Sequence, residues 1–225
     1  MTINGLIFDF DGLILDTETP RYKAWCEIYQ HFNLKFDLSD YAKSLGSSDD
    51  FFNPIINLAT KSNQPIDEKY WRKHQSRREL ELLADQPLMP GVLDYLNEAH
   101  RLNLKMAIAS SSDRAWVISH LDRFGLMDFF SVIETADEVP IVKPNPDLYQ
   151  KAISDLRLEP WEAIAFEDAP HGIVAAKKAG LFCVAVPNPL SAQLDLSHAD
   201  LMIKSFDQIH LPELLLKIES KRIST

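Results

Sequence analysis

The sequence has few cysteines and no long hydrophobic run. Its 225 residues include 2 Cys, Cys26 and Cys183, which stand far apart and lack the spacing of a metal site. We therefore expect buried thiols in a reducing compartment rather than a disulfide. No stretch is long and apolar enough to cross a bilayer, and the N-terminus lacks the basic start of a signal peptide. These absences predict a cytoplasmic protein that does not associate with membranes.

Basic residues are scarce relative to acidic ones. Lys and Arg number 23 against 33 Asp and Glu, which gives a formal net charge of −10. An acidic chain without a basic run is not expected to bind nucleic acid or an anionic membrane. A small anionic substrate is still compatible with this charge, because a local pocket can be positive on a negative protein. Nothing in the composition indicates an obligate protein partner.

What the chain does contain is a series of short apolar runs separated by helical patterns. This alternation is typical of βαβ units and predicts an α/β fold with a Rossmann-like parallel sheet covered on both faces. The expected strands are residues 6–8, 106–109, 132–133, 164–166, 183–186 and 201–203. The expected helices between them are residues 92–102, 115–124, 147–156 and 173–179.

Residues 17–86 interrupt this alternation. They carry aromatic and charged helical patterns at 21–32, 50–59 and 67–84 and no convincing strand. The alternation resumes at Pro90-Gly91. We therefore expect a Rossmann-like core formed by residues 1–16 and 87–225, with an inserted helical domain formed by residues 17–86.

Polar side chains gather where several of the expected strands end. Two acids follow the first strand, serines follow the second, an acidic pair follows residues 164–166, and a lysine stands in the loop before the helix at 147–156. Ligands of open α/β sheets bind beyond the carboxyl ends of the strands, so these side chains are expected to share one site. The set consists of Asp9, Asp11, Ser110, Ser111, Lys143, Glu167 and Asp168.

The acids of Asp9-Phe10-Asp11 raise a question of charge, because no Lys or Arg precedes Arg21. Carboxylates that repel each other at the edge of a hydrophobic core need a cation. Carboxylate oxygens with few other ligands suit Mg²⁺, which shares its coordination shell with water and phosphate. A phosphoryl group would then meet the metal on one side and Lys143 and Ser110 on the other. Phosphoryl transfer needs this kind of positioning and charge neutralisation.

The same residues resemble a known family. Asp9-Phe10-Asp11-Gly12, Ser110, Lys143-Pro144 and Glu167-Asp168 match, in order, the four motifs of the haloacid dehalogenase-like superfamily. The stretches DFDGLILDTE, VKPNPDLY and FEDAPHG look most like its β-phosphoglucomutase and phosphatase branch, and the helical insert stands where that branch has its cap. The resemblance covers essentially the whole chain. It implies a Mg²⁺-dependent enzyme that acts on a small phosphorylated metabolite.

The resemblance also implies a role for each matching residue. Asp9 would be the nucleophile that forms an aspartyl-phosphate, and it would also ligate Mg²⁺. Asp11 would protonate the leaving oxygen and then act as the base, with its backbone carbonyl at the metal. Ser110, its neighbour Ser111 and Lys143 would hold the phosphoryl oxygens. Asp168, together with Glu167, would complete the metal site.

Simpler structural roles compete at individual positions. The stretch Asp9–Gly12 could form only a solvated Asp-Gly turn. Ser110 could belong to a helix cap, for which Ser112 or Asp113 is the better candidate. Asp168 could cap the helix that follows it, which would be compatible with metal ligation. Four motifs in the expected order favour the functional interpretation.

Other function classes fit the sequence less well. A phospho-accepting receiver domain also gathers acids, a hydroxyl and a lysine around Mg²⁺, but its adjacent acid pair ends the first strand and it has no helical insert. A dehalogenase does not need Mg²⁺ and generally lacks the second acid. A phosphonatase would present a cap lysine for a Schiff base, and Lys23, Lys43 and Lys73 leave that alternative open without supporting it.

Within the family we expect a phosphatase for a small organic phosphomonoester, a phosphosugar, rather than a β-phosphoglucomutase. Mutases that resemble this chain carry a Gly-x-Ser-Arg stretch in the cap, and the matching residues here are Gly46-Ser47-Ser48-Asp49. An acid at that point would repel a second phosphate. The mutase alternative stays open, because another cap residue could supply the cation. The candidates for specificity in the cap are Arg21, Ser48, Lys73 and Arg77.

Overall fold

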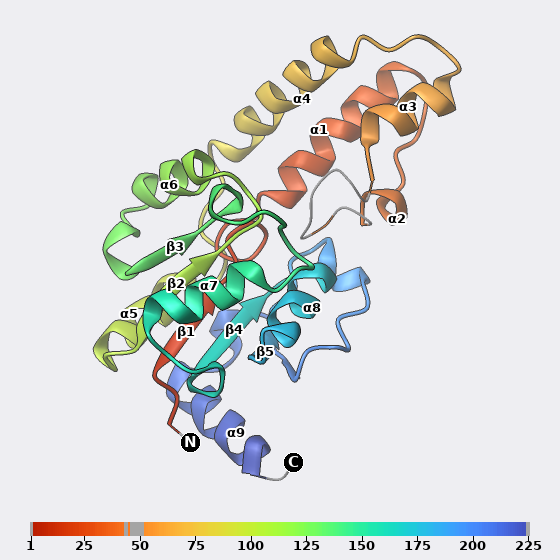
Figure 1. Cartoon of the computed structure of the whole chain (residues 1–225). Coiled ribbons are helices and arrows are strands. Elements are labelled where there is room, and N and C mark those ends of the chain that lie inside the picture. Colours follow the sequence, from red (N-terminus) through yellow and green to blue (C-terminus); the bar gives the residue numbers. More distant parts are fainter. Residues whose placement is uncertain (1, 43–44, 46–51, 224–225) are drawn as a thin grey trace.

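The computed structural model describes residues 2–42, 45 and 52–223. Within these residues, six parallel strands form one sheet in the order β3-β2-β1-β4-β5-β6 (Figure 1). Each expected apolar run forms one strand, which confirms the α/β class and the parallel sheet. The strands are β1 (Gly5–Phe8), β2 (Lys105–Ala109), β3 (Val132–Glu134), β4 (Ala163–Glu167), β5 (Phe182–Ala185) and β6 (Leu201–Met202).

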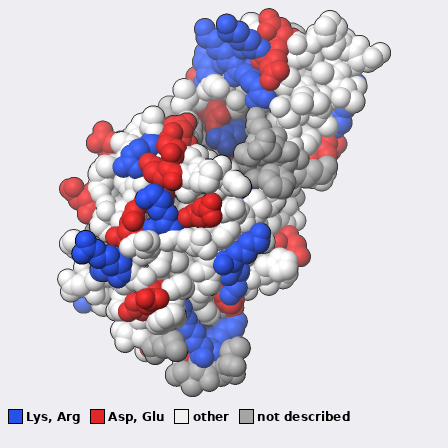
Figure 2. Space-filling view, in the orientation of Figure 1, with Lys and Arg blue, Asp and Glu red and all other residues white. Residues whose placement is uncertain are grey.

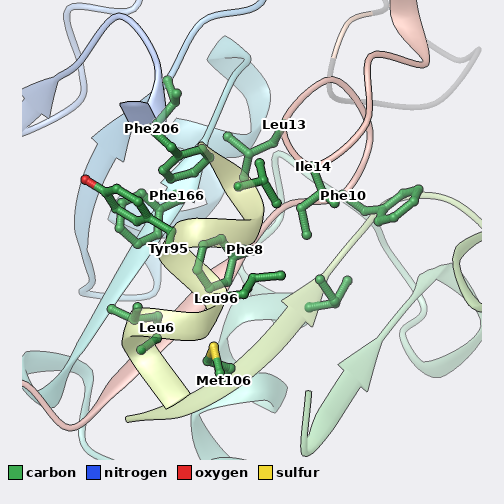
Figure 3. Close-up of a cluster of buried hydrophobic side chains, with 14 of the residues drawn as sticks. Leu6, Phe8, Phe10, Leu13, Ile14, Tyr95, Leu96, Met106, Phe166 and Phe206 are labelled. Atoms are coloured by element: carbon green, nitrogen blue, oxygen red, sulfur yellow. The ribbon is translucent and has the colours of Figure 1, made fainter. Parts of the chain in front are cut away.

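Helices cover both faces of the sheet, because successive strand side chains point to opposite faces. In β1, Leu6 and Phe8 belong to one apolar cluster, whereas Ile7 between them belongs to another. Figure 3 shows the aromatic part of the first cluster, in which the rings of Phe8 and Phe166 stack with centroids 5.0 Å apart. The helices on this face are α5 (Val92–Arg101), α6 (Arg114–Arg123) and α9 (Leu211–Ile223), and those on the other are α7 (Asp147–Leu156) and α8 (Pro170–Lys178).

The face toward α7 and α8 is lined by small side chains. Fully buried alanines of β2, β4 and β5 end at Cβ and let both helices lie close to the strands. This close packing brings Tyr149 of α7 within hydrogen-bonding distance of Glu167 at the end of β4. The alanines are Ala107, Ala109, Ala163, Ala165 and Ala185.

The helical insert packs around a third apolar cluster, which Ala169 and Leu190 of the sheet-bearing part also join. Trp25, Ile28 and Tyr29 of the first helix pack there with Leu58 of the third. The first and fourth helices run side by side above the sheet (Figure 1). The expected domain boundaries, 16/17 and 86/87, fall in the loops that flank this group. Its helices are α1 (Glu18–His31), α2 (Leu38–Tyr41), α3 (Pro54–Ser62) and α4 (Glu68–Leu83).

Some elements differ from the expectation. Helix α8 begins at Pro170 rather than at residue 173, because a proline in the first helical turn lacks an N–H that would have no partner there. Helix α9 was not expected, although Leu211, Leu214 and Ile218 have helical spacing and pack on the sheet. Helix α2 is a single short turn without such a pattern. Short 3₁₀ helices occupy Met127–Phe129, Ala136–Glu138, Pro160–Glu162, Ser191–Gln193 and Phe206–Gln208.

Both cysteines are free thiols. Cys183 is buried in β5, and this burial raises the pKa of its thiol. Cys26 in α1 is half-buried. Among the helices of the described ranges, none combines the length and the apolar character that a membrane crossing requires.

Candidate active site

Three acidic side chains meet at the carboxyl ends of β1 and β4. Asp9 directly follows β1, and its backbone N–H donates to the carbonyl of Phe166 at 3.0 Å, which continues the pairing of the two strands. Glu167 is the last residue of β4 and Asp168 follows it. Ligand oxygens of Asp9, Glu167 and Asp168 lie within 4.8 Å of one another, and all three residues are buried. The parallel register of β1 and β4 creates this acidic cluster.

The buried ammonium group of Lys143 lies between two of these acids. Its Nζ donates to Oδ1 of Asp9 at 2.5 Å and to Oε1 of Glu167 at 2.6 Å. Burial by itself would lower the pKa of Lys143, but the two carboxylates outweigh burial and raise that pKa above its ordinary value. The hydroxyl of Tyr149 donates to the same Glu167 oxygen at 2.5 Å. Lys143 therefore stays charged and holds both carboxylates in place.

The acidic cluster fits a divalent cation. Within the described residues, Oε2 of Glu167 and Oδ1 of Asp168 are buried without a hydrogen-bond partner. Burial raises the pKa values of Asp9 and Asp168, and the neighbouring carboxylates raise them further, while Lys143 opposes the shift. Buried carboxylate oxygens without partners are costly unless a cation binds them. The oxygen donors suit Mg²⁺, which Asp9, Glu167 and Asp168 would hold.

The side chain of Asp11 lies outside this cluster and accepts four hydrogen bonds. Its Oδ1 accepts from the hydroxyl of Thr17 at 2.9 Å and from the indole N–H of Trp116 at 2.8 Å. Its Oδ2 accepts from the hydroxyls of Ser112 at 2.7 Å and Ser110 at 3.2 Å. The expected contact of Asp11 with the metal, through its backbone carbonyl, stays a prediction.

The two serines after β2 differ in their surroundings. Ser110 is fully buried, and its Oγ accepts from the backbone N–H of Ser112 at 3.1 Å while donating to Asp11. The Oγ of Ser111 is buried and has no hydrogen-bond partner within the described part of the chain. The cap of α6 is Asp113, whose carboxylate accepts from a backbone N–H of the first turn. Phosphate binding by Ser110 and Ser111 stays a prediction.

Two close approaches explain glycines in the sequence motifs. Gly12 has φ of +81°, and a Cβ there would lie 2.6 Å from both Oδ2 of Asp168 and Nδ2 of Asn188. The same Asn188 amide donates to Oδ2 of Asp168 at 2.7 Å. At Gly172 a Cβ would overlap the carboxyl group of Glu167. Side chains at either glycine would therefore displace an acid of the cluster.

The alternative role of Asp168 as a helix cap is wrong. The residue before α8 is Ala169, which has extended backbone and makes no side-chain cap. Asp168 instead directs one oxygen to Asn188 and leaves the other in the acidic cluster. The proline at the first position of α8 makes a capping side chain less necessary, since it has no N–H to satisfy.

Sequence reasoning missed several residues of the site. Tyr149 stands in the VKPNPDLY stretch, but nothing local in the sequence shows that its hydroxyl reaches Glu167. Asn188 could have been found by the rule applied to the other strands, because it is a polar residue just beyond the end of β5. Thr17 and Trp116 carry no comparable signal, because they reach Asp11 from the residue before α1 and from inside α6.

The expected cap residues are not all at the site. Arg21 lines a cavity of about 530 Å³ between α1, α4 and the loop after β2. Lys73 and Arg77 are exposed on α4, where Arg77 pairs with Glu81 at 3.8 Å. Ser48 lies outside the described residues. Figure 2 shows basic and acidic side chains next to each other over the insert and in the recess below it.

Comparison with known proteins identifies the family. The family model described as "Haloacid dehalogenase-like hydrolase" matches residues 6–186, which include every residue of the acidic cluster and Lys143. The chain belongs to the haloacid dehalogenase-like hydrolases. This confirms the resemblance that the four motifs indicate.

Relatives within this family include phosphatases and mutases. The Bacillus subtilis (strain 168) protein named "Putative phosphatase YhcW" is 40% identical over 219 residues, which cover 97% of this chain and 99% of that protein. The "Beta-phosphoglucomutase" of the same organism is 30% identical over 190 residues, with coverage of 82% and 83%. The crystal structure of a CbbY mutant from Rhodobacter sphaeroides in complex with xylulose-(1,5)bisphosphate has a TM-score of 0.76 and 27% identity, with coverage of 95% and 99%. The chain is therefore a haloacid dehalogenase-like hydrolase of the β-phosphoglucomutase-like branch, in which relatives are named as phosphatases and as mutases.

Proposed function

We propose that this haloacid dehalogenase-like hydrolase is a phosphatase that depends on Mg²⁺ and hydrolyses a small phosphosugar through an aspartyl-phosphate on Asp9. The observation that carries the proposal is the position of Asp9. Its carboxylate accepts a hydrogen bond from the charged Lys143 and has ligand oxygens of two further acids within 4.8 Å, and a separate carboxylate, Asp11, stands just beyond Phe10. A nucleophile, a cationic site and a separate acid/base are what a two-step phosphoryl transfer needs.

In the first step, a carboxylate oxygen of Asp9 attacks phosphorus and the bond from phosphorus to the leaving oxygen breaks. Asp11 donates a proton to that oxygen, so that the product leaves as a neutral alcohol. Lys143 orients Asp9 and offsets charge on the phosphoryl oxygens. A Mg²⁺ ion held by Asp9, Glu167 and Asp168 would supply further charge neutralisation at these oxygens.

In the second step, Asp11 is a carboxylate and takes a proton from water. The water oxygen attacks phosphorus, the bond to Asp9 breaks, and inorganic phosphate leaves. The proton that Asp11 gains restores the acid for the next turnover, so one residue serves both half-reactions. Four hydrogen-bond donors hold the side chain of Asp11 in position for both half-reactions.

The mutase remains the second candidate, because one relative is named β-phosphoglucomutase. A mutase must bind a second phosphate with cap cations. Arg21, the cap candidate that lines the cavity, is already paired with Glu79 at 2.9 Å. Arg77 pairs with Glu81 on the exposed face of α4. This pairing favours hydrolysis over transfer to a second phosphorylated sugar.

Replacing Asp9 by Asn tests the proposal, since an amide cannot form the acyl phosphate. We expect loss of turnover on sugar phosphates in a variant that still folds, and mass spectrometry of the trapped wild type should place the phosphate on Asp9. Asp16→Asn in the same loop is the matched control and should retain activity. Phosphate found on Ser110 would contradict the assignment.

A second assay separates the phosphatase from the mutase. The enzyme is incubated with β-glucose 1-phosphate, Mg²⁺ and catalytic glucose 1,6-bisphosphate. We expect free inorganic phosphate as the main product. Glucose 6-phosphate that forms much faster than inorganic phosphate would favour the mutase.

A further inference from the structure

The cavity of about 530 Å³ lies next to the proposed acid/base. Ser112 and Trp116, which both donate to Asp11, also line this cavity. A leaving group whose oxygen is protonated by Asp11 would extend into this space. If the proposed function holds, the side chains of the cavity wall therefore face the part of the substrate that is not phosphate.

Arg21 lines the cavity from α1, but two acids neutralise its charge. Its Nε donates to Oε1 of Glu79 at 2.9 Å, and its Nη1 lies 3.7 Å from Oε1 of Glu18. The other oxygen of Glu79 accepts from the amide of Gln75 at 2.6 Å. Glu79 and Glu18 are buried, whereas the side chain of Arg21 is 33% exposed. The contact between α1 and α4 thus presents a compensated arginine to the cavity.

The second cation of the wall is also paired. Nε of Arg72 donates to Oε1 of Glu68, one helical turn earlier, at 2.8 Å. On the core side of the cavity, Asp113 adds a carboxylate. Each arginine in the described part of the wall therefore has an acidic partner. A second phosphate would gain little attraction there and would approach the carboxylate of Glu79.

The remainder of the wall suits a neutral, hydroxyl-rich group. Gln75, Ser76 and Ser111 offer amide and hydroxyl groups, and the Oγ of Ser111 has no partner among the described residues. Trp25 and Trp116 add indole rings. Sugar hydroxyls form hydrogen bonds with amide and hydroxyl groups, and the C–H faces of a sugar pack on aromatic rings.

We propose that this cavity receives the neutral polyhydroxyl part of a sugar or polyol monophosphate, and that Glu79 determines specificity by excluding a second phosphate or carboxylate. Glu79 acts by neutralising Arg21 and by placing its own charge beside it. The single phosphate binds at Asp9, and the remainder of the substrate contributes hydroxyl groups alone. Without the charge of Glu79, Arg21 keeps only its longer contact with Glu18, at 3.7 Å, and can pair with a second anion.

The variant Glu79→Gln tests this proposal, because the amide keeps the size and an acceptor for Arg21 but removes the charge. We would measure kcat/KM with Mg²⁺ for fructose 1-phosphate, fructose 1,6-bisphosphate and p-nitrophenyl phosphate. The expected result is a rise of about tenfold in the bisphosphate-to-monophosphate ratio, since a like charge near the second phosphate is lost. Adding Arg21→Gln to this variant should return the ratio toward the wild-type value.

Glu81→Gln is the matched control. Glu81 lies on the same helix but pairs with Arg78 at 3.1 Å on the surface. Its replacement should leave the ratio unchanged. An equal rise in this control would show a general effect of charge on α4 and would overturn the role of Glu79.

An unchanged ratio in a Glu79→Gln protein with the wild-type thermal midpoint would also overturn the proposal. If that variant does not fold, the kcat/KM values of the wild type for fructose 1-phosphate and fructose 1,6-bisphosphate test the proposal instead. A clear preference for the monophosphate supports the proposal, and an equal or higher kcat/KM for the bisphosphate contradicts it. Hydrolysis of p-nitrophenyl phosphate separates this inference from the proposed function. If the wild type hydrolyses neither p-nitrophenyl phosphate nor any sugar phosphate, the proposed phosphatase function is itself contradicted.

Discussion

The indole Nε1 of Trp116 donates a hydrogen bond of 2.8 Å to Oδ1 of Asp11. An indole N–H can only donate, whereas the serine hydroxyls at Oδ2 can also accept. In the proposed reaction, Asp11 must carry a proton before it protonates the leaving oxygen. Because a proton on Oδ1 would weaken that oxygen as an acceptor for the indole, we expect the proton on Oδ2. Trp116 would thus select the acidic oxygen as well as line the leaving-group cavity.

Replacing Trp116 by Phe should lower kcat/KM for a sugar phosphate by about tenfold, because one hydrogen bond to a charged group is lost. The loss on p-nitrophenyl phosphate should be smaller, since its leaving group needs little protonation. Trp161→Phe, at a half-exposed tryptophan of the 3₁₀ helix before β4, is the control and should change neither value. Equal losses on both substrates would assign Trp116 to packing alone.

Replacing Asp11 by Asn should also lower turnover of a sugar phosphate more than that of p-nitrophenyl phosphate, and the difference should be larger than for Trp116→Phe. The amide keeps the shape but cannot transfer a proton, so turnover of a sugar phosphate should fall by roughly 10²–10⁴-fold. Hydrolysis of the aryl phosphate should fall much less in its first step, which pre-steady-state release of nitrophenolate would measure. The role of Asp11 as acid would be refuted by identical losses in the two first steps.

Replacing Tyr149 by Phe removes only the hydroxyl that donates to Oε1 of Glu167. We expect the free energy of unfolding to fall by about 1 kcal/mol, and the Mg²⁺ concentration that half-saturates the thermal shift to rise several-fold. Thermal melts across a Mg²⁺ titration would measure both. Tyr70→Phe, at an exposed position of α4, should change neither quantity. Unaltered Mg²⁺ affinity in the Tyr149 variant would mean that Lys143 alone positions Glu167.

The effect of Mg²⁺ on stability should depend on pH. Burial and neighbouring carboxylates raise the pKa values of Asp9 and Asp168. At pH values between the ordinary and the raised pKa, the metal-free folded state therefore binds more protons than the unfolded chain. The free energy of unfolding should therefore fall as pH rises through that interval. Mg²⁺ competes with these protons, so its stabilisation should be larger at about pH 8 than at about pH 5. Thermal midpoints with Mg²⁺ and with a chelator measure this difference, and a shift of equal size at both pH values would contradict the metal assignment.

The sequence alone was sufficient for the α/β class, the positions of the strands and the presence of acids at their ends. These features depend on local patterns, because an apolar run of strand length and a helical period can be recognised within a few residues. A parallel sheet then places the carboxyl ends of β1, β2 and β4 at neighbouring points of one edge. The meeting of Asp9, Glu167 and Asp168 follows from this rule without any knowledge of packing.

Only the tertiary structure decided how these groups are paired. Trp116 reaches Asp11 across 105 residues of sequence, and Arg21 meets Glu79 across 58. No local pattern encodes either contact, because the first depends on how α6 packs against the loop after β1 and the second on how α1 packs on α4. The sequence presents Arg21 as a cation available to substrate, whereas the packing of α1 on α4 places a buried carboxylate against it. The charge that a substrate would meet is therefore set by helix packing, because neutralisation of one side chain requires a partner at about 3 Å.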